Sequence, residues 1–285
     1  AAVEDAIARL RPWAVVHAAG WADADAAEGA PDACRAATAD AAAAVAAACV
    51  RHGARLVVFS SDQVFDGGTD GVRRAAPYVE SDAPAPLGAL GRAHAELEAR
   101  VRAALPGALV VRTAACFGPW DAGNFVTRAL GALARGEPFD AASDQVVSPT
   151  YVVDLAHAAL DLLIDGERGV WHLANRGAVP WAELARRAAE LAGVPVHTLR
   201  ARPARELASD GAPPAPRPRY AALASARGHL MPALDDALGR YLRHRALAAA
   251  EGSAEGAADD ATGGTADGPG GGGRPWRYRQ AAGWV

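Results

Sequence analysis

The sequence predicts an α/β fold in which parallel strands form a doubly wound sheet with helices on both faces. Three continuous apolar runs have the length of buried parallel strands: Trp13–Ala19, Arg55–Ser60 and Ala108–Thr113. A helical pattern precedes each run, so helices and strands alternate along the chain. With 285 residues, 51% of them hydrophobic, the chain is long enough to bury a sizeable core.

Helices are expected where apolar residues recur with helical spacing, and glycine marks two of their ends. Gly53 and Gly136 each follow such a segment, where glycine suits the left-handed conformation that closes a helix. The expected helices are Val3–Leu10, Pro31–Arg51, Ala93–Leu105, Phe125–Arg135, Tyr151–Ile164 and Trp181–Leu191.

The charge pattern excludes several classes of partner. All 29 basic residues are arginine, the formal net charge is −4, and the arginines are scattered among acidic residues. No basic patch for nucleic acid is therefore expected. The sequence shows neither the charged-then-apolar layout of a signal peptide nor an apolar stretch of the roughly 20 residues that cross a bilayer. We expect a cytoplasmic protein without a membrane partner.

The three cysteines do not predict a disulfide or a metal site. Cys34, Cys49 and Cys116 lie within helix or strand patterns, without CxxC spacing or neighbouring histidines. We interpret them as small buried apolar residues.

The composition divides the chain into one domain and a tail. After about Arg245 the sequence becomes rich in glycine and poor in apolar side chains. Such a segment buries too little apolar surface to offset the entropy of ordering it. We expect one domain at residues 1–245 and a low-complexity, disordered tail at residues 246–285.

Several segments, in this order, resemble one family of enzymes. They are SSDQVFDG at 60–67, PYVESDAPAPLG at 77–88, RTAACFGP at 112–119, SDQVVSPTYVVDLA at 143–156, GVWHLAN at 169–175 and RPRYAAL at 217–223. With them the chain resembles the dTDP-4-dehydrorhamnose reductases of the extended short-chain dehydrogenase/reductase superfamily. The resemblance implies a Rossmann-like sheet with a small C-terminal substrate-binding part. It also implies NADPH or NADH as cofactor and the reduction of a dTDP-4-keto-6-deoxy sugar in dTDP-L-rhamnose biosynthesis.

The family's proton-donating pair is replaced in this chain. In this superfamily a tyrosine protonates the developing alkoxide, and a lysine four residues later lowers the pKa of that tyrosine. Pro86, Leu87, Gly91 and Arg92 fix the register, which places Leu90 at the tyrosine and His94 at the lysine. His94, one helical turn beyond the tyrosine position, is expected to point at the cofactor ribose rather than at the ketone.

The resemblance implies further site residues. Ser61 occupies the position of the catalytic hydroxyl that bonds the carbonyl oxygen. The implied cofactor-binding residues are Ala18, Ala19, Gly20, Ser60 and His94. The implied substrate-binding residues are Asp62, Val64, Phe65, Asn124, Gln145, Ser148, Thr150 and Trp181.

Two of these assignments have structural alternatives. Ser148 and Thr150 precede an expected helix, whose N-terminus favours an anion such as a diphosphate; alternatively, Thr150 is an ordinary N-cap. Trp181 resembles an aromatic residue that the family places beside the bound sugar or base, but core packing explains an aromatic residue there nearly as well. The positions His17, Thr38 and Gln63 also differ from the residues usual in the family.

The glycine-rich turn of a dinucleotide site is absent from the sequence. No strand and glycine-rich turn precede Val3, although the pyrophosphate needs them to approach a helix N-terminus. This pattern indicates an N-terminally incomplete chain or an upstream fused domain. Two functions stay open: a reductase, or a non-catalytic sugar-nucleotide-binding or regulatory protein on the same fold, with a nucleotide sugar as ligand and a homodimer as a possible assembly.

Overall fold

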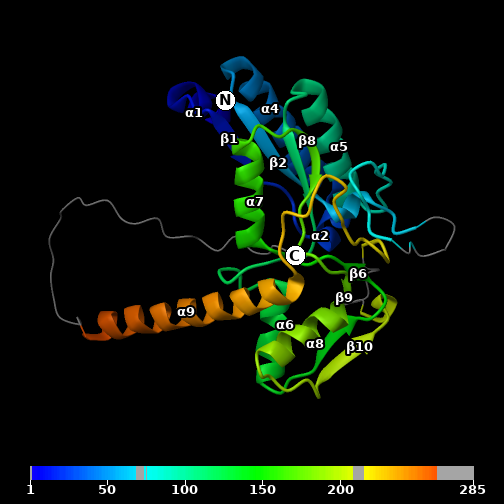
Figure 1. Cartoon of the computed structure of the whole chain (residues 1–285), viewed down its shortest axis with the longest axis vertical. Coiled ribbons are helices and arrows are strands. Elements are labelled where there is room, and N and C mark those ends of the chain that lie inside the picture. The colour runs from blue at the N-terminus through cyan, green and yellow to red at the C-terminus, as the bar shows by residue number, and fades with distance from the viewer. Residues whose placement is uncertain (1, 69–73, 75, 208–214, 262–285) are drawn as a thin grey trace.

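The centre of the molecule is a parallel sheet of four strands. The computed structural model describes residues 2–68, 74, 76–207 and 215–261, with side chains as far as Leu247. The strands are β1 (Ala14–His17), β2 (Arg55–Ser61), β3 (Leu109–Thr113) and β8 (Gly169–His172), in the order β1-β2-β3-β8 (Figure 1). All three pairings are parallel, which confirms the predicted α/β class.

Helices cover both faces of this sheet, as in a doubly wound fold. One face packs on α1 (Ala2–Leu10), α4 (Ala41–His52) and α5 (Ala89–Ala104), and the other packs on α7 (Val152–Ile164) (Figure 1). The alternation along β2 explains the division, because successive side chains of a strand point to opposite faces. Leu56 and Val58 belong to the first core and Val57 to the second.

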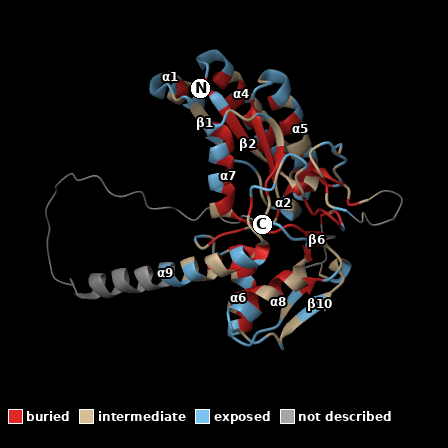
Figure 2. Cartoon of the chain, in the orientation of Figure 1, coloured by how far each residue is buried: buried red, intermediate tan, exposed pale blue. Residues whose placement is uncertain are grey.

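A smaller lobe follows the sheet at the carboxyl ends of its strands. It contains α6 (Phe125–Ala134), α8 (Trp181–Leu191) and the parallel pair β5 (Phe139–Ala142) and β10 (Leu199–Arg202). The buried residues form a core in the sheet region and a separate core in this lobe, where α6 and α8 meet α9 (Leu234–Ala261) (Figure 2). The short elements are α2 (Ala24–Gly29), α3 (Pro31–Arg35), η1 (Ala36–Asp40), η2 (Asp62–Val64), η3 (Ala204–Glu206), β4 (Cys116–Phe117), β6 (Val146–Val147), β7 (Thr150–Tyr151) and β9 (Val179–Pro180).

The predicted elements exist, but several boundaries differ. The strand predicted at 13–19 is shorter, and α5 begins at Ala89, four residues before the predicted start, because extended Gly88 precedes it. The helix predicted at 31–51 contains a π-helical turn, η1. Strand β8 lies in a segment that the periodicity did not predict as a strand. Helix α9 continues to Ala261, past residue 245, and residues 262–285 of the predicted tail lie outside the described residues.

One continuous helical run is long and apolar enough to cross a membrane. It spans Pro31–His52, 22 residues, so the expectation that no stretch approaches that length was wrong. The run belongs to the core by position, since Ala42, Val45 and Ala46 are buried against the sheet. A core helix of this kind meets the same length criterion, so the run is weak evidence of a membrane span.

Candidate functional site

The carboxyl end of β2 places two serines and an aspartate side by side. Ser60 and Ser61 are the last residues of the strand, and Asp62 opens the 3₁₀ turn η2. The Ser61 hydroxyl accepts a hydrogen bond from the Gln63 N–H at 3.1 Å and donates one to Asp62 Oδ1 at 3.1 Å. Ser61 therefore caps the turn with a side chain that is half-buried.

The Asp62 carboxyl is buried and has an altered pKa. Only 4% of the residue is exposed. Burial disfavours the carboxylate and raises the pKa of Asp62 to about 7, against the lowering effect of the hydrogen bond from Ser61. Burial also raises the pKa of the Cys116 thiol to about 11, and the charge of Asp62 adds to that shift. At neutral pH both the protonated and the ionised form of Asp62 are therefore populated.

Ser60 faces the opposite side and joins a buried ionic network. Its hydroxyl donates to Glu98 Oε1 at 2.6 Å. Glu98 pairs with Arg112 through two bonds of 2.8 and 2.7 Å, and the side chains of the pair are 4% and 3% exposed. Arg112 Nη1 lies 3.3 Å from His172 Nε2. The network connects α5, β2, β3 and β8 at the carboxyl edge of the sheet.

The network also assigns the tautomer of His172. Its Nδ1 lies 2.9 Å from the Ala224 carbonyl and 3.1 Å from the Tyr78 carbonyl, so Nδ1 carries the proton and donates. The Nε2 lone pair then accepts from Arg112. Burial lowers the pKa of His172, which keeps the ring neutral.

Leu90 and His94 lie on α5 but have different environments. Leu90 is 6% exposed and packs in an apolar cluster with Ala27 and Cys34. His94 Nδ1 is buried without a hydrogen-bond partner among the described residues. Burial lowers the pKa of His94 to about 4, against the opposing effects of Glu98 and the Trp21 backbone. Leu90 offers no proton, and His94 is neutral.

A second unpartnered imidazole lies at the end of β1. Within the described chain, His17 Nε2 is buried without a partner, and burial lowers the pKa of His17. Gly20 follows, and a Cβ atom there would meet nothing nearer than the Thr38 hydroxyl at 3.8 Å. Thr38 lies in the middle of the π-helical turn η1, and its hydroxyl accepts a hydrogen bond from the Trp21 N–H at 3.1 Å. Such π-helical turns are frequent at functional sites.

The cofactor contacts implied for Ala18, Ala19, Gly20 and His94 stay predictions. His17 Nε2 and His94 Nδ1 are buried polar atoms that a ribose hydroxyl or a carboxamide would satisfy. The predicted cofactor residues Ala18, Ala19 and Gly20 follow β1 directly. Ser60, predicted for the same site, gives its hydroxyl to Glu98 instead of leaving it free.

Four of the predicted substrate residues are fully enclosed by protein. Val64 and Phe65 have no exposed surface, and Phe65 stacks on Tyr78 at 3.9 Å between ring centroids. Asn124 caps α6 by accepting the Thr127 N–H at 3.0 Å. Thr150 lies in β7 and its hydroxyl donates to the Ser148 carbonyl at 3.3 Å. Substrate contact by these side chains stays a prediction.

The suggestion that Thr150 caps a helix was wrong. Helix α7 begins at Val152, and its N-cap is Tyr151, which makes no side-chain cap bond. The free Tyr151 N–H is accepted by Asn175 Oδ1 at 2.7 Å. Asn175 in turn donates to Asp154 at 2.9 Å. This helix start is therefore satisfied by the loop that follows β8.

Gln145 and Trp181 lie together in the smaller lobe. The Trp181 N–H donates to the Gln145 carbonyl at 3.3 Å. The half-buried indole of Trp181 packs against Phe125, with 4.7 Å between ring centroids. This contact is the core-packing role considered for Trp181, and the indole keeps a partly exposed surface.

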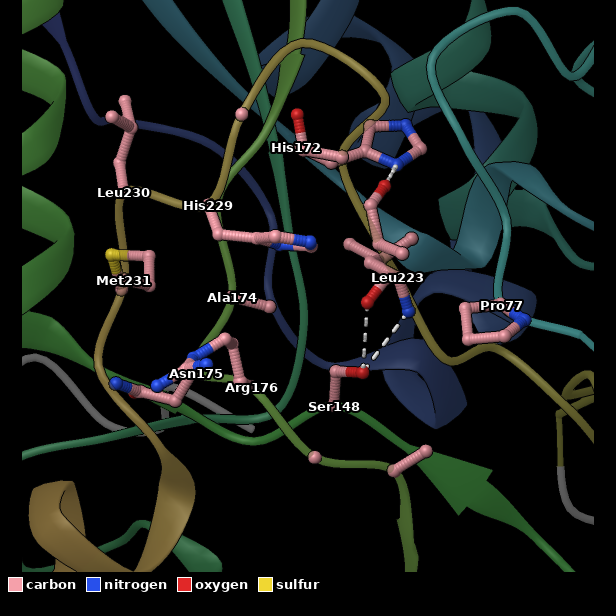
Figure 3. Close-up of a pocket in the computed structure, with 15 residues that line it drawn as sticks. Pro77, Ser148, His172, Ala174, Asn175, Arg176, Leu223, His229, Leu230 and Met231 are labelled. Atoms are coloured by element: carbon pink, nitrogen blue, oxygen red, sulfur yellow. Dashed lines mark hydrogen bonds between the residues drawn. The ribbon is translucent and has the colours of Figure 1, made fainter.

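A cavity lies where the carboxyl end of β8 meets the smaller lobe. Its volume is about 270 Å³, and Ser148 lines it together with His172, Asn175, Arg176, Leu223 and His229 (Figure 3). The Ser148 hydroxyl binds the backbone of Leu223, accepting its N–H at 3.0 Å. Arg176 is exposed and has no ion-pair partner in the described part of the chain, although most arginines there do. The cavity thus has one unneutralised cation in its wall.

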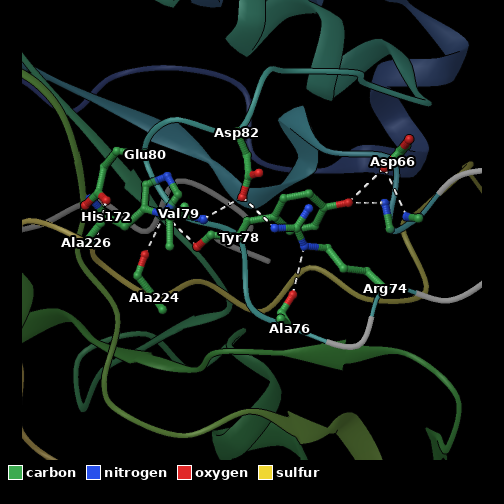
Figure 4. A network of polar contacts seen from close by, with 12 residues as sticks. Asp66, Arg74, Ala76, Tyr78, Val79, Glu80, Asp82, His172, Ala224 and Ala226 are labelled. Atoms are coloured by element: carbon green, nitrogen blue, oxygen red, sulfur yellow. Dashed lines mark hydrogen bonds and ion pairs between the residues drawn. The ribbon is translucent and has the colours of Figure 1, made fainter.

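Pro77 lines one side of this cavity, and residues near it in sequence form a network of polar contacts. Arg74 donates to Asp82 at 2.7 Å, and the Tyr78 hydroxyl donates to Asp66 at 2.8 Å (Figure 4). Glu80 accepts the His172 N–H at 3.0 Å and the Ser225 hydroxyl at 2.6 Å. Burial would raise the pKa of Glu80, but these hydrogen bonds outweigh it and lower that pKa.

Sequence reasoning missed the network and the cation. Glu98, Arg112 and His172 each interrupt an apolar pattern with a charged or polar residue, and that interruption was the available signal. For Arg176 no local signal exists, because its lack of an ionic partner is a property of the fold.

The chain is similar to sugar-nucleotide reductases. Residues 1–234 match the family described as RmlD substrate binding domain. The chain is 39% identical over 214 residues to a dTDP-4-dehydrorhamnose reductase of Mycobacterium tuberculosis, covering 74% of this chain and 68% of the relative. It is 33% identical over 222 residues to a dTDP-4-keto-6-deoxy-D-glucose reductase of Streptomyces niveus, covering 78% and 74%. A dTDP-4-dehydrorhamnose reductase of Bacillus anthracis, solved in complex with NADP, superposes with a TM-score of 0.78 at 29% identity, covering 85% of this chain and 84% of that structure.

Proposed function

The chain belongs to the RmlD substrate binding domain family, and on that premise we propose that it binds a dTDP-linked 4-keto-6-deoxy sugar and reduces its ketone. The ligand class follows from the relatives, which include dTDP-4-dehydrorhamnose reductases at 35–39% identity. The positions proposed for the ligand and for its ketone rest on residues of this chain.

The single observation that supports ligand binding best is the cavity beside β8. In open α/β sheets, ligands bind in the crevice at the carboxyl ends of the strands. This cavity has that position, and Arg176 in its wall has no ion-pair partner among the described residues. A guanidinium binds phosphate oxygens in a bidentate manner. We place the diphosphate of the nucleotide sugar at Arg176, with Ser148 and His229 on the neighbouring walls.

The ketone is proposed to lie at Ser61. This half-buried hydroxyl is at the carboxyl end of β2, in the position that the family resemblance assigns to carbonyl polarisation. A hydroxyl donor aimed at the ketone oxygen stabilises the negative charge that develops on it during reduction.

We propose NADPH or NADH as the cofactor, held on its nicotinamide side by His17, His94 and the Gly20 turn. The two unpartnered ring nitrogens support this placement, since a bound ribose or carboxamide would satisfy them. When bound, the cofactor supplies the hydride. The neutral ring of His94 serves here as a hydrogen-bonding group, because its lowered pKa removes the charge that a lysine would carry.

A second function is favoured by one observation at the same site. Leu90 stands at the tyrosine position and is buried among apolar side chains. A protein with this arrangement retains the ligand-binding parts of the fold and lacks the usual proton donor. The alternative is a sugar-nucleotide-binding or regulatory protein that performs no reduction.

Calorimetric titration of the full chain tests both proposals. dTDP-rhamnose and NADPH are titrated separately, and NADPH oxidation is then followed with the dTDP-4-keto-6-deoxy sugar. Binding of both with turnover supports the reductase. Binding of dTDP-rhamnose without turnover supports the binding protein. A folded chain that binds neither ligand contradicts both functions.

A further inference from the structure

We propose that Asp62 is the proton donor of this chain, acting through the Ser61 hydroxyl. The inference rests on the proposed reduction of a ketone at Ser61. Because Leu90 stands at the tyrosine position and has no proton to donate, the reduction needs another proton donor.

The geometry places a carboxyl directly behind the reacting hydroxyl. Ser61 Oγ and Asp62 Oδ1 are 3.1 Å apart, within hydrogen-bond distance. Asp62 is 4% exposed, whereas Ser61 is half-buried. A proton that leaves Asp62 along this hydrogen bond, or returns to it, therefore passes through the more accessible Ser61 hydroxyl.

The hydrogen-bonding capacity of Ser61 matches a relay. A hydroxyl has one proton to donate and two lone pairs to accept with. One lone pair accepts the Gln63 N–H at 3.1 Å. When Asp62 is protonated, its O–H fills the second lone pair, and the Ser61 proton is left free to point at the ketone oxygen. When Asp62 is ionised, Ser61 donates to it instead.

Three other titratable groups of the sheet region are poorer donors than Asp62. Burial raises the pKa of Cys116 to about 11, and Thr113 contacts that thiol at 3.8 Å. The Tyr78 hydroxyl donates to Asp66, and its pKa is raised to about 12 by burial. His94 is neutral at pH 7 because its pKa is about 4. Near Ser61, Asp62 is the described group whose pKa suits proton transfer at neutral pH.

The groups that act on Asp62 are uncharged: hydrogen bonds from the Ser61 and Gln63 side chains and from backbone N–H groups lower its pKa, and burial outweighs them. On the β4 side the titratable neighbour is the uncharged Cys116 thiol. On the α5 side Gly91 approaches the Gln63 carbonyl so closely that a Cβ atom would lie 2.0 Å from it. No arginine is among the largest causes of the Asp62 pKa shift.

The proposed step balances in atoms and charge. A reduced nicotinamide nucleotide, when bound, would supply the hydride for the new C–H bond at the ketone carbon and would be oxidised to the nicotinamide cation, while the C=O π pair would move to oxygen. That oxygen takes the Ser61 proton, Ser61 Oγ takes the Asp62 proton, and Asp62 becomes a carboxylate. After the product alcohol leaves, solvent returns one proton to Asp62 through Ser61.

The test compares Asp62→Asn with Asp66→Asn in the full chain. Asp66 lies in the same SSDQVFDG segment, but it is outside the proposed relay. The first readout is the ¹³C NMR titration of aspartate-labelled protein. We expect one carboxyl signal with a midpoint near pH 7, missing in Asp62→Asn and retained in Asp66→Asn. A midpoint below pH 5 for Asp62 overturns the proposal.

The second readout is the rate of ketone reduction. We expect Asp62→Asn to lower kcat about 10²- to 10⁴-fold, the usual effect of removing a general acid, while calorimetry still detects dTDP-rhamnose binding. Wild-type kcat should fall as pH rises through about 7, because the acid must be protonated. Asp66→Asn should retain both the rate and the pH profile.

The outcomes also separate this proposal from the proposed function. Wild-type rates in a folded Asp62→Asn protein overturn the role of Asp62 and leave the reductase standing. Ligand binding without wild-type turnover overturns the role of Asp62 and supports the binding protein. If Asp62→Asn does not fold, Ser61→Ala provides the check, since loss of the relay must remove the pH dependence near 7 from the residual rate.

Discussion

At the scale of the residue, the adjacent side chains Ser60 and Ser61 at the end of β2 have different roles. Ser60 donates to Glu98 inside a buried ion-pair network, whereas Ser61 and Asp62 form the proposed reaction site. The Glu98–Arg112 pair is nearly inaccessible, so its two charges depend on each other. Breaking a buried pair leaves an uncompensated charge, which costs far more than losing a surface pair.

We predict that Glu98→Gln lowers the free energy of unfolding by about 3–5 kcal/mol, because Arg112 stays buried without its carboxylate. Urea denaturation followed by circular dichroism measures the change. Glu137→Gln is the matched control, since Glu137 pairs with Arg135 on an exposed surface, and we expect a much smaller change. Equal effects of the two substitutions would contradict the buried network.

We predict that Arg176→Ala weakens dTDP-rhamnose binding by roughly 10- to 100-fold, since hydrogen bonds to charged groups contribute about 1.5–3 kcal/mol. Isothermal calorimetry of the folded variant measures the affinity. Arg205→Ala is the control, because exposed Arg205 lies outside the cavity wall. Unchanged affinity in Arg176→Ala would place the diphosphate elsewhere.

At the scale of the element, the start of α5 is fixed against the turn η2. Gly91 lies on α5 where a Cβ atom would come within 2.0 Å of the Gln63 carbonyl and 2.9 Å of Pro86. Backbone atoms cannot yield as a flexible side chain can. The close approach therefore sets how far α5 stands from Asp62 and Ser61.

We predict that Gly91→Ala destabilises the fold by roughly 3 kcal/mol or more, because the helix must move away from η2. Gly131→Ala is the matched helical control: its Cβ atom meets only the flexible Arg135 side chain at 3.4 Å. There alanine should stabilise α6 by about 0.5–1 kcal/mol. Thermal and urea unfolding of both variants provide the measurement, and a neutral Gly91→Ala would show that the contact can relax.

At the scale of the whole molecule, titratable groups buried in the sheet region couple its stability to pH. Burial lowers the pKa of His17, His94 and His172 below their ordinary value of 6.5. Each histidine therefore stabilises the fold above pH 6.5, and this contribution is lost as pH falls, because the unfolded chain binds the proton first. Asp62 acts in the opposite direction: its raised pKa stabilises the fold fully below about pH 4, and this contribution is lost as pH rises through about 7.

We predict that the free energy of unfolding decreases between pH 6.5 and pH 5, because three histidines outweigh one aspartate. Asp62→Asn should make this decrease steeper by removing the opposing group. Urea unfolding at half-unit pH steps measures both slopes. A wild-type free energy that is constant over this range, or a shallower slope in Asp62→Asn, would contradict the assigned pKa directions.

Much of the fold could be predicted from sequence, because buried parallel strands are continuous apolar runs. Strand β8 was missed because GVWH contains a glycine and a histidine, and His172 is explained only by its contacts with Glu80 and Arg112. The site was predicted in part. Ser61 and Asp62 lie in a recognisable segment, whereas the partners of Glu98 and the ionic isolation of Arg176 arise from residues distant in sequence.

The alternation of β2 has a consequence for how this protein can vary. Ser60 belongs to the face that holds the sheet to α5, and Ser61 begins the segment where chemistry is proposed. A slip of one residue in strand register would exchange them, placing the reacting hydroxyl in the ion-pair network and the structural one at the site. The residue that the fold requires and the residue that the proposed reaction requires are therefore encoded by neighbouring codons. An insertion or deletion within β2 would disrupt the ion-pair network and the proposed site together.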